Sequence, residues 1–102
     1  MIFINKENKT KNPIFFIENL NEDKYVKIHE ILTRDLKCEV VSETIPHILV
    51  DYARDGIIFR HVEDDMIGSY FTSHKRKKES KEYYEKLERV LTELVAKLNM
   101  LR

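Results

Sequence analysis

The stretch that decides the fold is ILVDYARDGIIFRH, residues 48–61, in which two apolar runs flank the pair Asp55-Gly56. A type I′ turn needs positive φ at both of its central positions, and an Asp-Gly pair tolerates this geometry. The stretch therefore predicts a tight β-hairpin whose loop is Asp55-Gly56. The register that follows from this loop pairs Arg54 with Ile57, Tyr52 with Phe59, Asp51 with Arg60 and Val50 with His61.

The chain continues from this hairpin into a second polar turn at Asp64-Asp65. A short turn there predicts a third strand over residues 66–72, with Tyr70 opposite Phe59. One face of the sheet would then carry the aromatic side chains of Tyr52, Phe59 and Tyr70. The opposite face would carry Leu49, Ala53, Ile58, Val62, Ile67 and Phe71. One face must cover the core. The other face could be covered by the N-terminal segment, by a second copy of the chain or by a different protein.

Helices are predicted on both sides of this β-rich middle. Asn21 suits a helix N-cap. After Asn21, apolar residues recur at helical spacing, at Tyr25, Ile28, Leu32 and Leu36. Residues 79–101 predict a second, longer helix, because apolar residues recur there three and four positions apart. Short β-type runs at residues 2–4, 14–17 and 39–44 predict further strands.

Together these elements predict a single α+β domain over residues 1–102. Its strands form an antiparallel β-meander, and two helices pack on it in a two-layer sandwich. The order is β-α-β-β-β-β-α, with residues 2–4 as a candidate extra N-terminal strand. The chain has one cysteine, Cys38, and no signal-peptide or membrane-spanning stretch, which is typical of a cytoplasmic protein without a membrane partner.

Acidic and basic residues are separated along the chain, although its formal net charge is zero. Residues 18–65 carry 12 acidic and 6 basic side chains, whereas residues 66–102 carry 5 acidic and 9 basic ones. Such segregation can present an acidic surface to a basic partner, because complementary charge steers association.

The acidic residues of the meander and its turns form the candidate partner-binding site. They are Asp51, Asp55, Glu63, Asp64 and Asp65, with Tyr52 and Tyr70 as aromatic anchors. Turn chemistry alone can explain Asp55, Asp64 and Asp65. The accumulation of acids, with only Arg54 and Arg60 nearby in the sequence, favours a surface that binds a basic protein.

In architecture, the chain resembles the small α+β immunity proteins of bacterial competition systems, such as contact-dependent inhibition. The resemblance covers the first helix, the Asp55-Gly56 hairpin, the acidic turn and the C-terminal helix. It implies a small cytoplasmic inhibitor that occludes a basic toxin domain, for example a nuclease. A nuclease needs a cationic cleft for phosphates, so carboxylates and aromatic side chains can block it without catalytic residues or a cofactor.

The basic run His74-Lys75-Arg76-Lys77-Lys78 supports an alternative hypothesis. These side chains could contact nucleic-acid phosphates in a regulatory protein, with the C-terminal helix as a dimer interface. The simpler explanation of the basic run is a solvated loop that leads into the acidic start of the helix. No helix-turn-helix, ribbon or finger pattern accompanies the run.

The histidines offer little sign of catalysis or metal binding. They are scattered, with no HExxH pattern and no second cysteine for a zinc site, so we predict no metal. His61, expected on a strand near Asp51 and Arg60, is the one candidate general base. No nucleophile is placed beside it, so we expect a sheet histidine and no enzymatic activity.

Overall fold

The computed structural model describes residues 1–8, 12–45, 48–75 and 78–101. The chain forms, in order, β1 (Phe3–Glu7), β2 (Ile14–Glu18), α1 (Glu22–Tyr25), α2 (Ile28–Glu30), the π-helical turn η1 (Ile31–Asp35), β3 (Glu39–Ile45), β4 (Leu49–Arg54), β5 (Ile57–Asp64), β6 (Gly68–Ser73) and α3 (Lys81–Met100). Within these residues, six strands make one antiparallel sheet in the order β1-β2-β6-β5-β4-β3. The α+β class is confirmed, and the extra N-terminal strand is present as β1.

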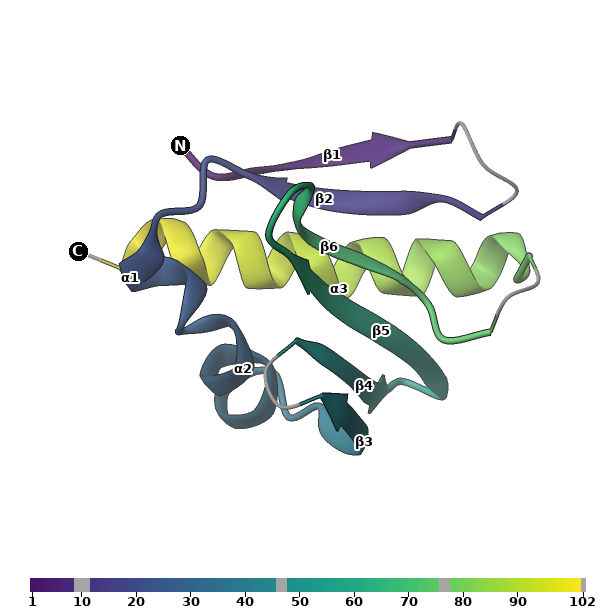
Figure 1. Ribbon diagram of the computed structural model, residues 1–102. Helices are drawn as coiled ribbons and strands as arrows, with labels where there is room; N and C mark the ends of the chain where they lie inside the picture. The colour runs from purple at the N-terminus through teal and green to yellow at the C-terminus, as the bar shows by residue number, and fades with distance from the viewer. Residues whose placement is uncertain (9–11, 46–47, 76–77, 102) are drawn as a thin grey trace.

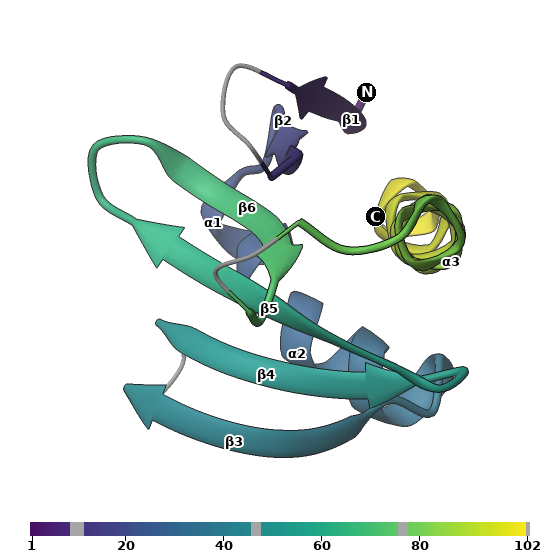
Figure 2. The ribbon, with the colours of Figure 1, turned by 90° about the vertical axis from the view of Figure 1, so that its right-hand side faces the viewer.

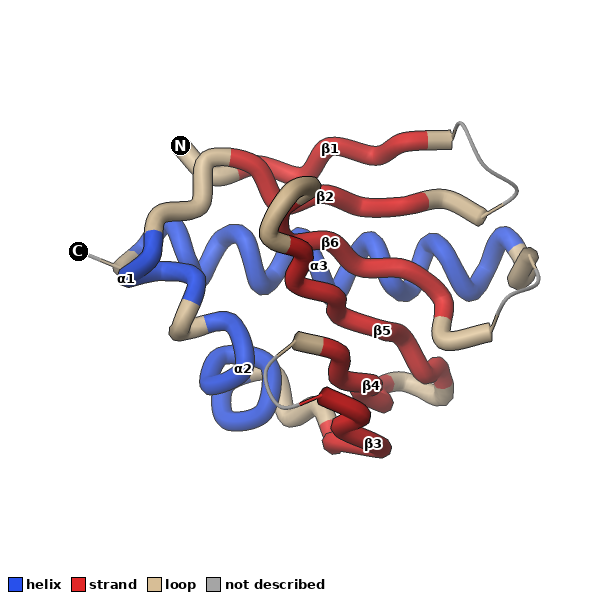
Figure 3. Tube along the Cα trace, in the orientation of Figure 1, coloured by secondary structure: helices blue, strands red, loops and turns tan. Residues whose placement is uncertain are grey.

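The helices all lie on one face of the sheet (Figures 1 and 2). Helix α3 crosses behind β5 and β6, and α2 lies closer to β4, whereas α1 lies away from β4, near the end of β2 (Figures 2 and 3). The core between these layers is built from fully buried side chains of both. The largest of them are Tyr52, Phe15, Phe59, Phe71, Ile28, Leu32, Leu87, Leu91, Leu94 and Leu98.

The Asp55-Gly56 hairpin forms as the sequence predicts. Both loop residues have positive φ, 54° at Asp55 and 81° at Gly56. The predicted register of β4 and β5 is confirmed at every pair: Arg54 with Ile57, Tyr52 with Phe59, Asp51 with Arg60 and Val50 with His61. Local turn chemistry therefore fixed the centre of the sheet.

The second turn differs from the prediction, and the difference changes which side chains share a face. One carboxylate oxygen of Asp64 accepts hydrogen bonds from the backbone N–H groups of Met66, at 2.8 Å, and Ile67, at 3.0 Å. The loop is therefore longer than the pair Asp64-Asp65, and β6 begins only at Gly68, whose φ is 101°. The register of β5 and β6 shifts by three residues as a result.

This shift moves Tyr70 to the face away from the helices, where it lies opposite Val62 instead of Phe59. The third aromatic ring on the helix side is Phe71, whose centroid lies 6.0 Å from that of Phe59. The N-terminal strands extend the edge of the sheet next to β6 and do not cover its open face. On that face lie, by strand alternation, Phe3, Ile14, Phe16, Leu49, Ile58, Val62 and Tyr70.

The first predicted helix forms, but it is broken into short pieces. Asn21 caps it as expected, because its side-chain oxygen accepts a hydrogen bond from the backbone of Lys24 at 2.9 Å. The helix stops after Tyr25, resumes at Ile28 and ends in the wider turn η1. The residues that pack on the sheet are still the predicted apolar ones, with Ile28, Leu32 and Leu36 buried and Tyr25 half-buried.

The second predicted helix is regular over its whole length. Ser80 caps α3 by accepting a hydrogen bond from the backbone of Tyr83 at 3.1 Å. At the other end of α3, the side-chain amide of Asn99 accepts from the N–H of Ile2 and donates to its carbonyl, both at 2.9 Å. The last turn of α3 is thereby joined to the residue that precedes β1.

Candidate functional site

The predicted acidic residues do not form one continuous patch. Asp55 lies at one end of β5, in the hairpin loop, whereas Asp64 and Asp65 lie at the other end. The eight residues of β5 span roughly 26 Å at about 3.3 Å per residue. Asp55 is exposed and pairs with Arg54 at 3.6 Å, so it belongs to a separate surface.

Asp51 is buried on the open face of the sheet and already has its partners. Its carboxylate accepts two hydrogen bonds from the guanidinium of Arg60, at 2.9 and 3.2 Å, and one from the hydroxyl of Ser42 at 3.1 Å. The hydrogen bond to Asp51 raises the pKa of Arg60. This carboxylate stabilises the sheet and presents little surface to a partner.

The two predicted aromatic anchors have different environments. Tyr52 is fully buried on the helix side, and its hydroxyl lies 2.8 Å from Nδ1 of His29. Burial raises the pKa of Tyr52 well above its ordinary value. Tyr70 is half-buried on the open face, with its ring centroid 5.6 Å from that of Phe16. Of the pair, only Tyr70 has an exposed ring surface.

Carboxylates from separate parts of the chain do converge at one end of the molecule, which we call the acidic end. It comprises Glu18, Glu22, Glu63, Asp64 and Asp65, which line two adjoining hollows around Tyr25. Glu18 and Glu22 come from the β2 to α1 connection, and the others from the β5 to β6 turn. In the described part of the chain, Glu22 and Asp65 form no ion pair with a basic side chain.

The negative potential of the acidic end acts on Tyr25. Its pKa is raised first by burial and then by the charges of Glu63 and Asp65. The sequence analysis placed Tyr25 among the apolar residues of the first helix and did not single out Glu22. What it missed is that the start of α1 and the β5 to β6 turn lie at the same end of the molecule.

Apolar side chains accompany the carboxylates at this end. Met66 is 95% exposed, Ile67 59% and Ile48 45%, and all three line the same hollows. Exposed apolar side chains that gather on one surface are typical of sites that contact a partner. The acidic end therefore combines exposed apolar side chains with carboxylates, and both kinds of group occur in protein interfaces.

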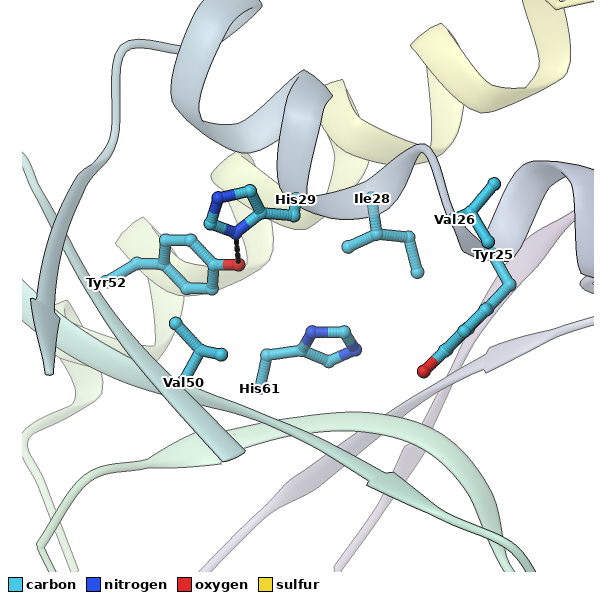
Figure 4. Close-up of a pocket in the computed structure, with 7 residues that line it drawn as sticks. All are labelled: Tyr25, Val26, Ile28, His29, Val50, Tyr52 and His61. Atoms are coloured by element: carbon cyan, nitrogen blue, oxygen red, sulfur yellow. Dashed lines mark hydrogen bonds between the residues drawn. The ribbon is translucent and has the colours of Figure 1, made fainter. Parts of the chain in front are cut away.

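A pocket of about 380 Å³ opens between the helices and β4–β5, next to the acidic end. Its lining, drawn in Figure 4, is Tyr25, Val26, Ile28, His29, Val50, Tyr52 and His61. The pocket shares Tyr25 with the two hollows of the acidic end. It was not predicted from the sequence, because it lies where the first helix breaks.

His61 lies in this pocket. The sequence analysis expected it beside Asp51 and Arg60 instead. Strand alternation puts those two residues on the open face and His61 on the helix face. Nε2 of His61 lies 2.7 Å from a carboxylate oxygen of Glu63 and 2.9 Å from the hydroxyl of Ser69. A Ser-His-acid relay needs the serine and the acid on different ring nitrogens, so this arrangement is not a hydrolytic triad.

The described start of the basic run, His74 and Lys75, lies at the far end of β6 from the acidic end. Lys75 and Lys78 are exposed, while Arg76 and Lys77 lie outside the described residues. Among the residues that are described, no three His, Cys, Asp or Glu side chains are grouped closely enough to hold a metal ion. The described helices include none with the length and apolar character needed to cross a membrane.

Comparison with protein-family models, with curated proteins and with solved structures gave no match.

Proposed function

We propose that this chain is a small protein-binding inhibitor that uses its acidic end to bind and neutralise a basic protein, in the manner of an immunity protein that blocks a toxin domain. The observation that carries the proposal is the convergence of carboxylates from two connections around Tyr25. Unpaired carboxylates at the surface raise the association rate of a cationic partner.

The apolar side chains at the acidic end support tight binding rather than charge attraction alone. Interfaces gain most of their energy from a few buried apolar or aromatic side chains at the centre, with polar groups around them. Met66 and Ile67 would be buried by a partner, and each would contribute on the order of 1.5 to 3 kcal/mol if fully buried. Tyr25 supplies the aromatic surface between them and the pocket.

A cationic active site is the kind of surface that fits this end. A nuclease holds phosphates with lysine and arginine side chains, and a cluster of carboxylates can take the place of the phosphates. Such an inhibitor acts by occlusion and needs no catalytic group of its own. The proposal keeps Asp64 and Asp65 from the sequence prediction as partner contacts, and keeps Glu63 for its negative charge, because its carboxylate is hydrogen-bonded to His61. It adds Glu18 and Glu22, and leaves out Asp51, Tyr52, Asp55 and Tyr70, which do not line the two hollows.

The test compares two double charge reversals. The variant Glu22→Lys with Asp65→Lys changes the acidic end, and leaves Asp64 in place because its carboxylate stabilises the turn. The control Glu39→Lys with Glu88→Lys reverses two exposed acids elsewhere that likewise form no ion pair with the described basic side chains. Both proteins should unfold at nearly the same temperature as the wild type.

Tagged wild-type and variant proteins are incubated with lysate of the source cells, and retained proteins are identified at low and high salt. We expect one basic protein to be retained by the wild type and the control, and lost from the acidic-end variant. The purified partner should also lose its activity when the wild type is added. Equal retention by both variants would contradict the assignment of the acidic end.

The nucleic-acid hypothesis is tested in the same experiment. Salt-sensitive retention of DNA or RNA by the wild type, with no basic protein recovered, would favour the run at residues 74–78 instead. Loss of that retention in Lys75→Glu with Lys78→Glu would assign it to the basic side chains. Retention of nucleic acid would then replace the inhibitor proposal.

A further inference from the structure

The pocket between α1–α2 and the sheet exists because the first helix is irregular. Helix α1 ends at Tyr25, and the chain runs through Val26 and Lys27 before it turns into α2. Lys27 is the N-cap residue of α2, and its side chain forms no capping hydrogen bond to the helix. The helix then widens into η1. Wide helical turns of this kind are common beside functional sites.

The walls of the pocket are apolar, but polar groups converge on its interior. Val26 is exposed at the edge of the pocket, and Ile28 and Val50 are buried beneath it. The hydrogen-bonded pair of His29 and Tyr52 closes one side, and the ring of His61 projects into the space from the sheet (Figure 4). Small-molecule sites have this composition, with mostly apolar walls and a few placed polar groups.

His61 is 5% exposed, and one of its ring nitrogens forms no hydrogen bond with the residues that the structure describes. Its hydrogen bonds all use Nε2, which contacts the carboxylate of Glu63 and the hydroxyl of Ser69. A carboxylate only accepts hydrogen bonds, so Glu63 favours the tautomer with the proton on Nε2. The other nitrogen, Nδ1, is then an acceptor that faces the pocket. It is not among the described side-chain atoms that are both buried and without a partner, so solvent in the pocket reaches it.

An acceptor that faces the pocket can take a hydrogen bond from water or from a ligand that fills the space. A volume of about 380 Å³ corresponds to about a dozen water molecules, at roughly 30 Å³ each. It also lies in the usual range for small-molecule sites, about 300 to 1,000 Å³. The space is thus much larger than one bridging water requires.

We propose that this pocket binds a planar aromatic molecule, uncharged or cationic, that donates an N–H or O–H hydrogen bond to Nδ1 of His61. The half-buried ring of Tyr25 and the exposed side chain of Val26 offer apolar surface to a flat ligand, and Ile28, Val50 and Tyr52 are buried beneath them. Glu63 and Asp65 lie near Tyr25, at the side of the pocket that adjoins the acidic end. Their negative charge disfavours an anionic ligand.

The test uses three probes that share one ring system. Indole is uncharged and has an N–H donor, 1-methylindole lacks the donor, and indole-3-carboxylate adds a negative charge. Each is titrated into the full chain at pH 8 while the side-chain NMR signals of His61 and Tyr25 are followed. We expect indole to shift both signals saturably, 1-methylindole to bind roughly 2- to 10-fold more weakly, and the carboxylate to bind weakest.

The variant His61→Gln separates the hydrogen bond from the shape of the pocket. The amide nitrogen of glutamine can replace Nε2 toward Glu63 and Ser69, but nothing replaces Nδ1. In this variant the preference for indole over 1-methylindole should disappear. If the variant does not fold, the three probes on the wild type still decide.

Two results would overturn the proposal. One is the absence of a saturable shift at His61 and Tyr25 up to millimolar indole, and the other is equal affinity of the wild type for indole and 1-methylindole. Neither result depends on whether the acidic end binds a protein, because the probes do not contain a basic partner.

Discussion

Two helical segments cover the same face of the sheet, and they differ in regularity. Helix α3 runs without interruption for 20 residues, and its stripe of Leu87, Leu91, Leu94 and Leu98 is completely buried. The segment that contains α1, α2 and η1 breaks at Val26 and leaves a pocket beneath it. The two segments contribute to the same core, but only the irregular one leaves polar side chains facing an open space.

The difference indicates a division of roles within one small domain. A regular helix buries its apolar stripe with few voids, and therefore provides stability. An irregular helix packs less completely, and the space it leaves can hold a ligand. Here that irregular segment also begins at the acidic end, next to Glu22 and Tyr25. The candidate sites are thus both on the less regular side of the core.

The largest expected effect comes from truncating one buried side chain in each segment. Leu91→Ala should lower the free energy of unfolding by about 2 to 5 kcal/mol, because it leaves a cavity in a filled part of the core. Ile28→Ala should cost less, about 2 kcal/mol, because Ile28 already lines the pocket. Urea unfolding of the two variants measures both values. Equal losses would mean that the pocket is closed in solution.

The second prediction concerns Cys38, a buried thiol just after the irregular segment. Burial raises its pKa from 9.0 to about 11. The folded protein therefore keeps the thiol protonated to a higher pH than the unfolded chain does. The stabilisation from this difference is complete below pH 9 and is lost between pH 9 and about 11, by at most roughly 2 to 3 kcal/mol.

Urea unfolding at pH 8 and pH 10.5 measures the loss, and Cys38→Ala should reduce it because alanine does not titrate. Part of the loss should remain in the variant, since burial also raises the pKa of Tyr52 and Tyr83. An unchanged pH dependence in Cys38→Ala would show that the thiol is reached by water in the folded state.

A smaller effect is expected at Lys37, where the irregular segment ends. Lys37 has a φ of 57°, in the left-handed region that glycine adopts more easily. This backbone conformation of Lys37 allows the N–H of Cys38 to donate a hydrogen bond to the carbonyl of Leu32, at 2.8 Å, which closes the irregular segment. Lys37→Gly should raise the free energy of unfolding by up to about 1 kcal/mol, measured by thermal or urea unfolding. A destabilised variant would mean that the lysine side chain contributes more than the strain costs.

The smallest effects are expected from surface ion pairs on the two segments. In α3, Glu93 pairs with Arg54 of β4 at 2.6 Å, and in the irregular segment Glu30 pairs with Arg34. Both pairs are partly exposed, so Glu93→Gln and Glu30→Gln should each cost no more than about 1 kcal/mol. Melting temperatures of the two variants and of the wild type, at low and high salt, measure the two losses. A larger loss at Glu93 would indicate that contact between α3 and β4 depends on charge.

Sequence reasoning succeeded where short-range chemistry decides the structure. The positive φ tolerated by Asp55 and Gly56 fixed the central hairpin and its register. Asn21 marked the start of the first helix, and leucine spacing marked α3. In each case the relevant residues are neighbours in the sequence, so their pattern is visible without the fold.

Sequence reasoning failed where a side chain reorganised the backbone. The carboxylate of Asp64 binds two N–H groups in the next turn, which lengthens the loop and moves Tyr70 to the open face. The break after Tyr25 leaves no clear signature, because the apolar spacing continues through Ile28. The acidic end and the pocket depend on these two features and on contacts between distant segments, so neither could be located from the sequence.

The hydrogen bonds between Asn99 and Ile2 connect residues at opposite ends of the chain. Both ends of the trace lie on the same side of the molecule (Figure 1). A short flexible linker could therefore join them, and a new pair of ends could be opened in the Asp55-Gly56 loop. A circular permutant made in this way would keep the acidic end and the pocket intact, and would carry its new termini at the far end of β5.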